Sequence, residues 1–425
     1  MTAFKYRDYQ SDAIRKAQNI LTVNDFVYLS MEVRTGKTLT AFGIADVIGA
    51  ERVLFITKKK AISSINDDYD LLQVNGKANF NLVVINYESL HKIPQLDYDL
   101  IVMDEAHSCG AFPKPSKRVK ELKEISKRCC TAQFILLSGT PTPESYSQMY
   151  HQVCMIPNNP FSKYKNFYAF AKDYVDVKQK RLGSMVVNDY SAGKESILDE
   201  VRHHMVSVTQ KQAGFRSKIK EHFHEVQIDR RIQTVMDKLT ADRVFEGKNN
   251  VILADTPVKL LSKFHQLSSG TIKFDDGSAV TICKAKAQYI YDNFSTGKHA
   301  IFYKFKQELE ALRDVYGKEL TTDLEEFYDD PTKNIALQFL SGREGVSLKQ
   351  ADNLVMYNVD FSATTYWQAR DRMTTKDRAI NNVHWIFSDI GIENDIYKAV
   401  SKKKDYTLNH FKRSHLGGFK QKKMF

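Results

Sequence analysis

The sequence predicts an α/β protein with two parallel-sheet domains and a mostly helical insertion between them. Short runs rich in Val, Ile, Leu and Phe alternate with helix-length segments over the first 150 residues. The alternation resumes near residue 284, and aromatic and basic residues interleave in the stretch between. Such alternation is typical of parallel sheets with helices on both faces. The length of 425 residues allows two or three domains.

Nine runs are interpreted as buried strands because they are short, apolar and bounded by polar residues. They span residues 26–31, 52–57, 81–87, 99–105 and 134–140, and then 299–304, 334–340, 353–359 and 383–388. Helices are expected over residues 39–48 and 306–316. The predicted divisions are a first domain 1–157, a helical basic segment 158–225, a second domain 226–400 and a basic tail 401–425.

The middle segment carries aromatic residues at near-helical spacing: Phe161, Phe167, Phe170 and Tyr174. This spacing predicts that they face a core. The tail carries clustered lysines around Gly417-Gly418. A nucleic-acid-contacting arm and a solvated chain end both fit that composition.

The net charge of +11 favours a polyanionic partner, although a merely basic enzyme has the same balance. The five cysteines include no Cys-x-x-Cys pair, which argues against a zinc site. Their odd number argues against a disulfide framework and favours a reducing, cytoplasmic compartment. The polar N-terminus is unlike a signal peptide. No apolar stretch approaches the roughly 20 residues of a membrane span, so no membrane association is expected.

Residues 31–38 read Met-Glu-Val-Arg-Thr-Gly-Lys-Thr after the first predicted strand. A phosphate-binding loop needs backbone N–H groups, a following helix N-terminus and a lysine. Gly36 permits close backbone approach, Lys37 neutralises terminal phosphates and Thr38 offers a hydroxyl to Mg²⁺. The usual leading glycine is replaced by Met31. The segment therefore predicts an ATP site.

Asp104-Glu-Ala-His107 follows the fourth predicted strand. There Asp104 is placed to bind Mg²⁺ through water, and Glu105 to orient or deprotonate an attacking water. His107 is expected to relay a hydrogen bond between motifs rather than to bind metal. The hydroxyls of Ser138-Gly-Thr-Pro141 are candidates to sense this acidic motif across the sheet.

The phosphate loop, the acidic box, Ser138-Gly-Thr-Pro141 and Gln368-Ala-Arg-Asp-Arg372 occur in the order found in superfamily-two helicases. Within that superfamily the chain most resembles Swi/Snf-type DNA translocases, in a compact, phage-like form. Further resembling segments are Arg7-Asp-Tyr-Gln10, Asn86-Tyr-Glu88, residues 300–305, residues 341–348 with Ala351-Asp352, and Gly391-Ile-Glu393. The resemblance covers roughly residues 5 to 400 and implies two RecA-like motor domains.

The resemblance also implies roles for single residues. Catalytic roles fall on Lys37, Asp104, Glu105 and Arg372, with Arg372 as an arginine finger. Nucleotide contacts fall on Arg7, Gln10, Arg34, Thr35, Gly36, Lys37, Thr38, Gly345 and Gln368, and metal binding on Thr38 and Asp104. Predicted nucleic-acid contacts are Thr57, Lys58, Arg343 and Ser347, made to phosphates and hence largely sequence-independent.

One position departs from the family pattern. The family usually places a second arginine three residues after Arg372, where this chain has Thr375. Lys376 or Arg378 could take its place, or Arg372 acts alone. The leading hypothesis is an ATP- and Mg²⁺-dependent DNA translocase or helicase. An RNA helicase and a non-catalytic nucleic-acid-binding module are the alternatives; a nuclease is disfavoured because no further acidic cluster has metal-binding spacing.

Overall fold

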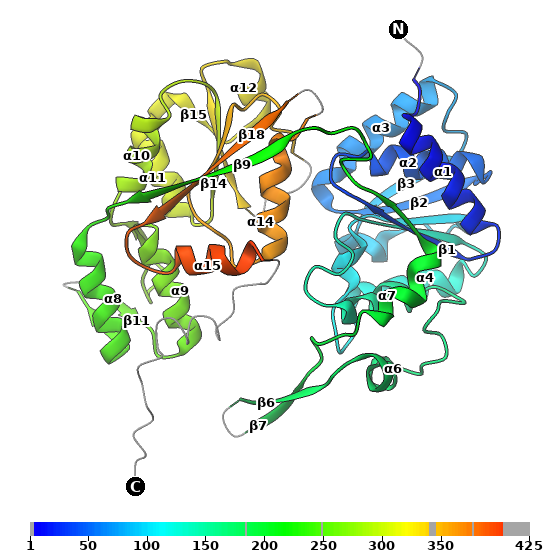
Figure 1. The fold of residues 1–425 in the computed structure, drawn as a ribbon, viewed down its shortest axis with the longest axis horizontal. Coiled ribbons are helices and arrows are strands. Elements are labelled where there is room, and N and C mark those ends of the chain that lie inside the picture. The colour runs from blue at the N-terminus through cyan, green and yellow to red at the C-terminus, as the bar shows by residue number, and fades with distance from the viewer. Residues whose placement is uncertain (1–3, 183–184, 248–249, 340–345, 376–377, 403–425) are drawn as a thin grey trace. The chain divides into compact units, whose positions relative to one another are not determined.

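The computed structural model divides the chain into two compact units, Met1–Phe215 and Arg216–Phe425. It describes residues 4–182, 185–247, 250–339, 346–375 and 378–402. Each unit is built around its own six-stranded parallel sheet (Figure 1). The predicted pair of RecA-like parallel-sheet domains is therefore confirmed. Among the helices that the structure describes, none has the length and apolar character that a membrane span requires.

The first sheet has the strand order β3-β2-β4-β5-β1-β8, with every neighbouring pair parallel. Its strands are β1 (Phe26–Met31), β2 (Arg52–Thr57), β3 (Asn81–Asn86), β4 (Leu100–Met103), β5 (Gln133–Ser138) and β8 (Met205–Val208). The first five agree with the predicted runs to within two residues. The carboxyl ends of these strands share one edge, which is where the predicted nucleotide motifs begin.

Alternate side chains of these strands enter two separate cores. Val27, Leu29 and Met31 pack with one set of helices, and Phe26 and Tyr28 pack with the other. The first set is α1 (Asp8–Leu21), α2 (Lys37–Val47) and α3 (Ile62–Val74). The second is α4 (Lys117–Arg128), α5 (Met149–Val153), α6 (Phe167–Tyr174) and α7 (Ser196–Val201). The sheet is thus covered on both faces (Figure 1).

The segment predicted as a mostly helical insertion over residues 158–225 has a different make-up. Besides α6 and α7 it contains β8, β9 (Lys218–Val226) and the hairpin of β6 (Lys178–Leu182) and β7 (Met185–Asp189). Strand β8 completes the first sheet and β9 the second, so the chain divides after Phe215, inside the segment predicted as an insertion. The predicted core aromatics Phe161, Phe167, Phe170 and Tyr174 are buried, as expected.

The second sheet has the order β15-β16-β14-β17-β18-β9, again with parallel neighbours. Its remaining strands are β14 (His299–Tyr303), β15 (Leu320–Thr321), β16 (Asn334–Gln338), β17 (Asn353–Met356) and β18 (Ile380–Ser388). Two short hairpins accompany it: β10 (Val244–Glu246) with β11 (Val251–Leu253), and β12 (Thr271–Lys273) with β13 (Ala279–Thr281). The four runs predicted for the second domain are all strands here.

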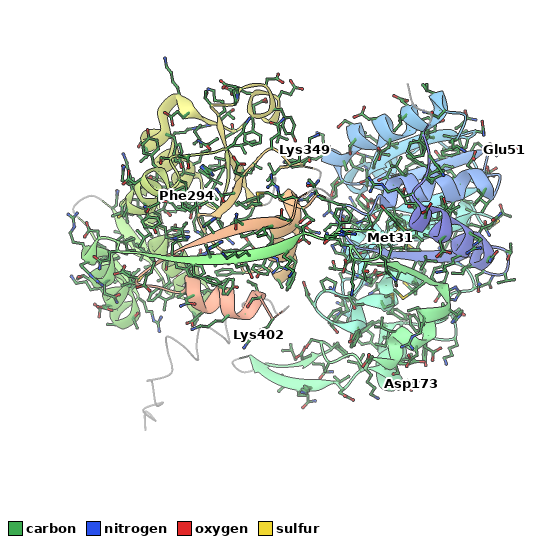
Figure 2. All side chains as sticks on the ribbon, turned by 45° about the horizontal axis from the view of Figure 1, so that its top comes forward. Met31, Glu51, Asp173, Phe294, Lys349 and Lys402 are labelled. Carbon is green, nitrogen blue, oxygen red and sulfur yellow. The ribbon has the colours of Figure 1, made fainter. Side chains whose placement is uncertain are left out.

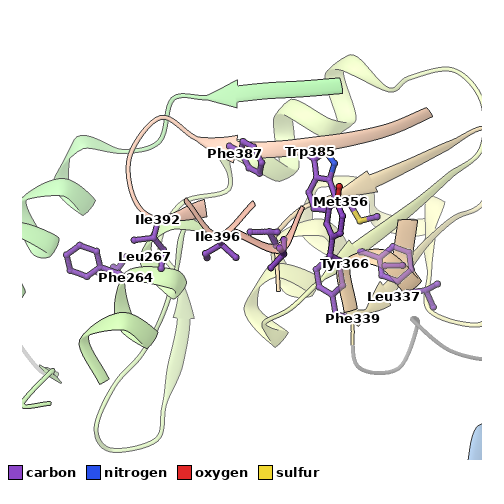
Figure 3. Close-up of a cluster of buried hydrophobic side chains, with 14 of the residues drawn as sticks. Phe264, Leu267, Leu337, Phe339, Met356, Tyr366, Trp385, Phe387, Ile392 and Ile396 are labelled. Carbon is purple, nitrogen blue, oxygen red and sulfur yellow. The ribbon is translucent and has the colours of Figure 1, made fainter. Parts of the chain in front are cut away.

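Helices also cover both faces of the second sheet. One core takes side chains from α8 (Arg230–Asp242), α9 (Pro257–Ser268), α12 (Leu324–Asp329), α14 (Ala363–Arg370) and α15 (Glu393–Val400). The other takes them from α10 (Ala285–Asn293) and α11 (Lys306–Tyr316). Figure 3 shows the first of these cores, in which the rings of Tyr366 and Trp385 stack with centroids 5.2 Å apart. This packing fixes α14, the helix that carries Gln368, against the sheet.

Candidate nucleotide site

The loop after β1 is shaped by a close backbone approach. Met31, labelled in Figure 2, ends β1, and Lys37 begins α2. Gly36 has φ +77°, which favours glycine, and a Cβ there would lie 2.4 Å from Gln10 Nε2, so the Gln10 side chain would have to move. Lys37 Nζ donates to the Met31 carbonyl at 3.3 Å, which folds the lysine back over the loop. Because the first N–H groups of α2 lack partners within the helix, this turn is suited to a phosphate.

The start of α1 is tied to the same loop. Gln10 Nε2 donates to the Gly36 carbonyl at 3.4 Å, and Gln10 Oε1 accepts the Arg7 N–H at 3.0 Å. Tyr9 OH donates to the Thr35 carbonyl at 3.1 Å and accepts from Arg7 Nη1 at 3.2 Å. The structure therefore brings Arg7, Gln10, Thr35 and Gly36 together, as the motif resemblance implies.

Three residues around Gly36 complete the loop and the first turn of α2. The Thr35 hydroxyl is buried and donates to the Glu32 carbonyl at 2.7 Å. Arg34 takes a left-handed conformation with φ +63°. Thr38 lies half-buried in the first turn of α2. Thr35 thus stabilises the turn, whereas Thr38 retains surface that a ligand could reach.

The acidic pair follows β4. Thr57 Oγ1 donates to Asp104 Oδ2 at 2.8 Å, and Tyr87 OH donates to the Asp104 carbonyl at 2.6 Å. Burial and the neighbouring charge of Glu105 raise the pKa of Asp104 to about 6, against the opposing effects of Lys37 and Thr57. The charge of Lys37 acts on both carboxylates. The phosphate loop and the acidic box therefore lie at one site.

Glu105 is connected to the motif at the end of β5. Its backbone is left-handed, with φ +50°, and its side chain is 17% exposed. His107 Nδ1 lies 3.1 Å from Glu105 Oε2 and 3.0 Å from Ser138 Oγ, which also accepts the Thr140 N–H at 3.1 Å. Burial works to raise the pKa of Glu105, but the His107 hydrogen bond and nearby positive charges outweigh it and lower that pKa. His107 Nδ1 thus contacts both motifs, and the lowered pKa of Glu105 favours its ionised form.

The donor set fits a magnesium nucleotide. Mg²⁺ usually keeps several waters and takes one or two carboxylates together with substrate phosphates. Asp104 and the Thr38 hydroxyl supply oxygens of this kind, and Lys37 supplies the positive charge that phosphates need. In the part of the chain that the structure describes, no group of three His, Cys, Asp or Glu side chains could hold a metal on its own. A metal bound here would depend on the nucleotide for its remaining ligands.

The predicted residues of the second unit lie on α14 and just beyond it. Gln368 is 6% exposed on α14, and Arg372 lies in the short 3-10 helix Asp371–Met373. Arg372 Nη1 donates to the Val346 carbonyl at 3.4 Å, and the Arg372 carbonyl accepts the Leu348 N–H at 3.2 Å. Arg372 is therefore joined to the segment that ends the Ser341–Leu348 motif. Of that motif, Arg343 and Gly345 lie outside the described residues.

The residues that could replace the missing second arginine are used differently. The Thr375 carbonyl accepts from Ser217 Oγ at 2.9 Å. Arg378 donates to the carbonyls of Ala351 at 2.6 Å and Lys349 at 3.0 Å, so it holds the turn before β17. Lys376 lies outside the described residues. Arg378 is thus engaged with backbone carbonyls, and Arg372 stays the predicted finger.

Three predicted nucleic-acid contacts fall on described residues. Thr57 is fully buried, and its hydroxyl is bonded to Asp104. Lys58 is half-buried at the start of the short 3-10 helix Lys59–Ala61, and its charge helps to lower the pKa of Glu105. Ser347 is half-buried, with its carbonyl bonded by Tyr328 OH. Thr57 is therefore placed to support Asp104, a role that its sequence position did not indicate.

Tyr9 and Tyr87 are site residues that the sequence did not single out. Each lies inside a quoted segment, Arg7-Asp-Tyr-Gln10 or Asn86-Tyr-Glu88. Each uses its phenol to hold a backbone carbonyl of the site. A hydroxyl that positions main chain leaves no charge pattern, so only its place within a motif could have drawn attention to it.

Comparison with known proteins gives one family match and several structural ones. Residues 3–143 match the family "Type III restriction enzyme, res subunit", a third of the chain that contains both nucleotide motifs. This match agrees with the superfamily-two helicase resemblance of the first unit. No curated protein matches the chain.

Two solved structures from Sulfolobus solfataricus are similar to the chain. One is the SWI2/SNF2 ATPase core in complex with dsDNA, with 14% identity, coverage of 98% of this chain and 94% of that chain, and a TM-score of 0.42. The other is the SWI2/SNF2 ATPase core domain, with 14% identity, coverage of 95% and 90%, and a TM-score of 0.41.

Proposed function

We propose that the chain is an ATP-dependent DNA translocase or helicase, a superfamily-two motor of Swi/Snf type. The observation that carries the proposal is the meeting of Lys37, Asp104 and Glu105 at one edge of the first sheet. The hydrogen-bonded connection from Glu105 through His107 to Ser138 supports it, because it links the hydrolytic residue to a separate strand end. The family match over residues 3–143 supports it as well.

The residues divide the work of hydrolysis as follows. Lys37 and the N-terminal turn of α2 hold the terminal phosphates, and Gln10 and Arg7 support the loop from α1. Thr38 and Asp104 are the ligands proposed for Mg²⁺, which when bound supplies charge neutralisation at the phosphates. Glu105, held ionised, accepts a proton from the attacking water or orients it. Arg372 is proposed to stabilise the transferred phosphoryl group as an arginine finger, with Gln368 in support.

DNA is the proposed track. The net charge of +11 favours phosphate contacts, which are largely independent of sequence and weaken with salt. Lys58, Arg343 and Ser347 are the proposed contacts, and Gly345 is proposed to act with them near the nucleotide. Hydrolysis coupled to contacts with the backbone would move the protein along one strand of a duplex or of a branched structure.

The decisive experiment is ATP turnover with duplex DNA, forked DNA, single strands and RNA. Lys37→Ala and Glu105→Gln should each lower DNA-stimulated turnover at least about a hundredfold, because each removes a group that acts on the transition state. Lys117→Ala, an exposed lysine on α4, is the matched control and should leave turnover unchanged. Near-normal turnover by both site variants would overturn the proposal. Stimulation by RNA alone would favour an RNA helicase, and no turnover with any substrate a non-catalytic binding module.

A further inference from the structure

The first unit has a pocket whose lining includes no residue of the phosphate loop. This pocket, of about 180 Å³, lies between α4, with the segment before it, and the start of α6. Both helices are labelled in Figure 1. Its lysines are Lys114, Lys120, Lys123 and Lys165, all with exposed side chains. None of the residues proposed for ATP hydrolysis lines it.

The pocket has an unbalanced positive charge. Its lining contains no Asp or Glu. On the same helix α4, Lys117 and Lys127 form ion pairs with Glu121 at 3.6 Å and Glu124 at 2.8 Å. Within the described ranges of the chain, none of the four pocket lysines forms such a pair. Lysines that converge without carboxylates are suited to a ligand that carries phosphates.

The buried part of the pocket lining is neutral. Phe167, Tyr150 and His151 are buried, whereas Tyr168 is 45% exposed. Burial and the charge of Lys123 lower the pKa of His151 to about 4, despite its hydrogen bond with the Ala111 carbonyl. The histidine is therefore uncharged at neutral pH. An exposed aromatic ring beside cationic side chains is the arrangement that stacks a base and holds its phosphates.

We propose that this pocket binds one nucleotide of single-stranded DNA, with the base against Tyr168 and the flanking phosphates on the lysines. The concave shape selects a single strand, because bases stacked within a duplex cannot enter a pocket of this size. The inference deepens the proposed function, on which it rests, by giving the motor a contact for an unpaired strand. It assigns that contact to α4 and α6 rather than to the motifs at the nucleotide site.

Two charge-matched double variants test the lysines. Lys120→Glu/Lys123→Glu alters the pocket, and Lys117→Glu/Lys127→Glu makes the same charge change on the same helix outside it. Binding of a fluorescent oligothymidine is measured by anisotropy without ATP over a series of salt concentrations. The pocket variant should bind about tenfold more weakly, and the slope of log K against log salt should become shallower by about 1.4, as expected for two lost phosphate contacts. The control should bind within about twofold of the unaltered protein. Equal loss in both variants would overturn the proposal.

Two variants of Tyr168 distinguish base stacking from electrostatic attraction. Tyr168→Ala should weaken oligothymidine binding about tenfold, whereas Tyr168→Phe should retain it. Neither variant should change the affinity for a blunt duplex of equal length. A similar loss of affinity for duplex and single strand, or no loss for Tyr168→Ala, would contradict a base-stacking role.

ATP turnover without nucleic acid should be the same in all variants. If the unaltered protein shows no turnover, the motor proposal fails, but the difference between pocket and control variants would still be measurable.

Discussion

At the carboxyl ends of the first unit's strands, Lys37, Asp104 and Glu105 are only partly buried. At the same edge of the second sheet, one ion pair is enclosed. The side chains of Lys286 and Glu393 are each 1% exposed, and Lys286 Nζ lies 2.5 Å from Glu393 Oε1. Lys286 Nζ also donates to the Tyr357 carbonyl after β17, and Glu393 accepts the Ser388 N–H at the end of β18. Two sheets of the same architecture therefore use the same edge in different ways.

The difference teaches what turns the edge of a parallel sheet into a site. In parallel sheets ligands bind at the carboxyl ends of the strands. Such a ligand needs polar groups that are not already hydrogen-bonded or ion-paired within the protein. In the second unit the charges satisfy one another and the backbone, so they stabilise the fold. In the first unit the Lys37 ammonium donates to the Met31 carbonyl at 3.3 Å and keeps exposed surface. Lys37 and the Lys286–Glu393 pair therefore differ in exposure rather than in the presence of charge.

Breaking the buried pair should give the largest effect. Glu393→Ala leaves the Lys286 charge buried without a partner, which should lower the free energy of unfolding by about 3–5 kcal/mol. Both tryptophans, Trp367 and Trp385, lie in the second unit, so their fluorescence during urea unfolding reports on that unit alone. The control Lys286→Met/Glu393→Leu replaces both charges and should recover most of the loss. A single variant as stable as the unaltered protein would show that the pair is not structural.

The sequence predicted the strands of both sheets well where they are central and apolar. It missed three edge strands, β8 of the first sheet and β9 and β15 of the second. Strand β9 reads Lys-Ile-Lys-Glu-His-Phe-His-Glu-Val, and its charged residues hide the alternation that a half-buried strand shows. Strands β8 and β9 flank the division after Phe215, which lies inside the segment predicted as an insertion. Edge strands expose one side, so their composition is a weak signal.

The candidate site was predictable as far as its motifs extend. Gly36, Lys37, Asp104 and Glu105 follow strands that the sequence identified, and the topology brings those strand ends together. The support given by Thr57 to Asp104 depends on a contact between two strands 47 residues apart in sequence. The Lys286–Glu393 pair spans 107 residues. Contacts of this range become visible only when the order of the strands in the sheet is known.

Acid should reduce the stability of the second unit by an intermediate amount. His384 Nδ1 lies 3.0 Å from His224 Nε2. Burial together with the charges of nearby histidines lowers the pKa of His384 to about 4. The unfolded chain takes up this proton near the ordinary value of 6.5, whereas the folded chain does so only near 4. The contribution of neutral His384 to the free energy of unfolding is therefore fully present above pH 6.5. It is lost as the pH falls from 6.5 to 4, which lowers the free energy of unfolding by about 2–3 kcal/mol.

The measurement is urea unfolding followed by tryptophan fluorescence between pH 7.5 and 4.5, within the window set by the His384 shift. His384→Gln cannot take up the proton, so its stability should change less over that range. Titration of carboxylates affects both proteins, and the difference between them isolates the histidine. Identical pH profiles would show that His384 does not contribute. A flatter dependence of the free energy of unfolding on pH in His384→Gln would show that neutral His384 stabilises the second unit.

The smallest expected effect tests the first unit's edge at Thr57. Thr57→Val removes the hydroxyl that donates to Asp104 at 2.8 Å. Loss of a hydrogen bond to a charged group should lower ATP turnover about tenfold. Because Thr57 is fully buried, affinity for DNA measured without ATP should not change. Lys58→Ala is the comparison, since this neighbour is a predicted DNA contact. If Thr57→Val instead weakens DNA binding and leaves turnover intact, Thr57 contacts the nucleic acid as first predicted, and the edge of the first sheet is more open than its hydrogen bonds indicate.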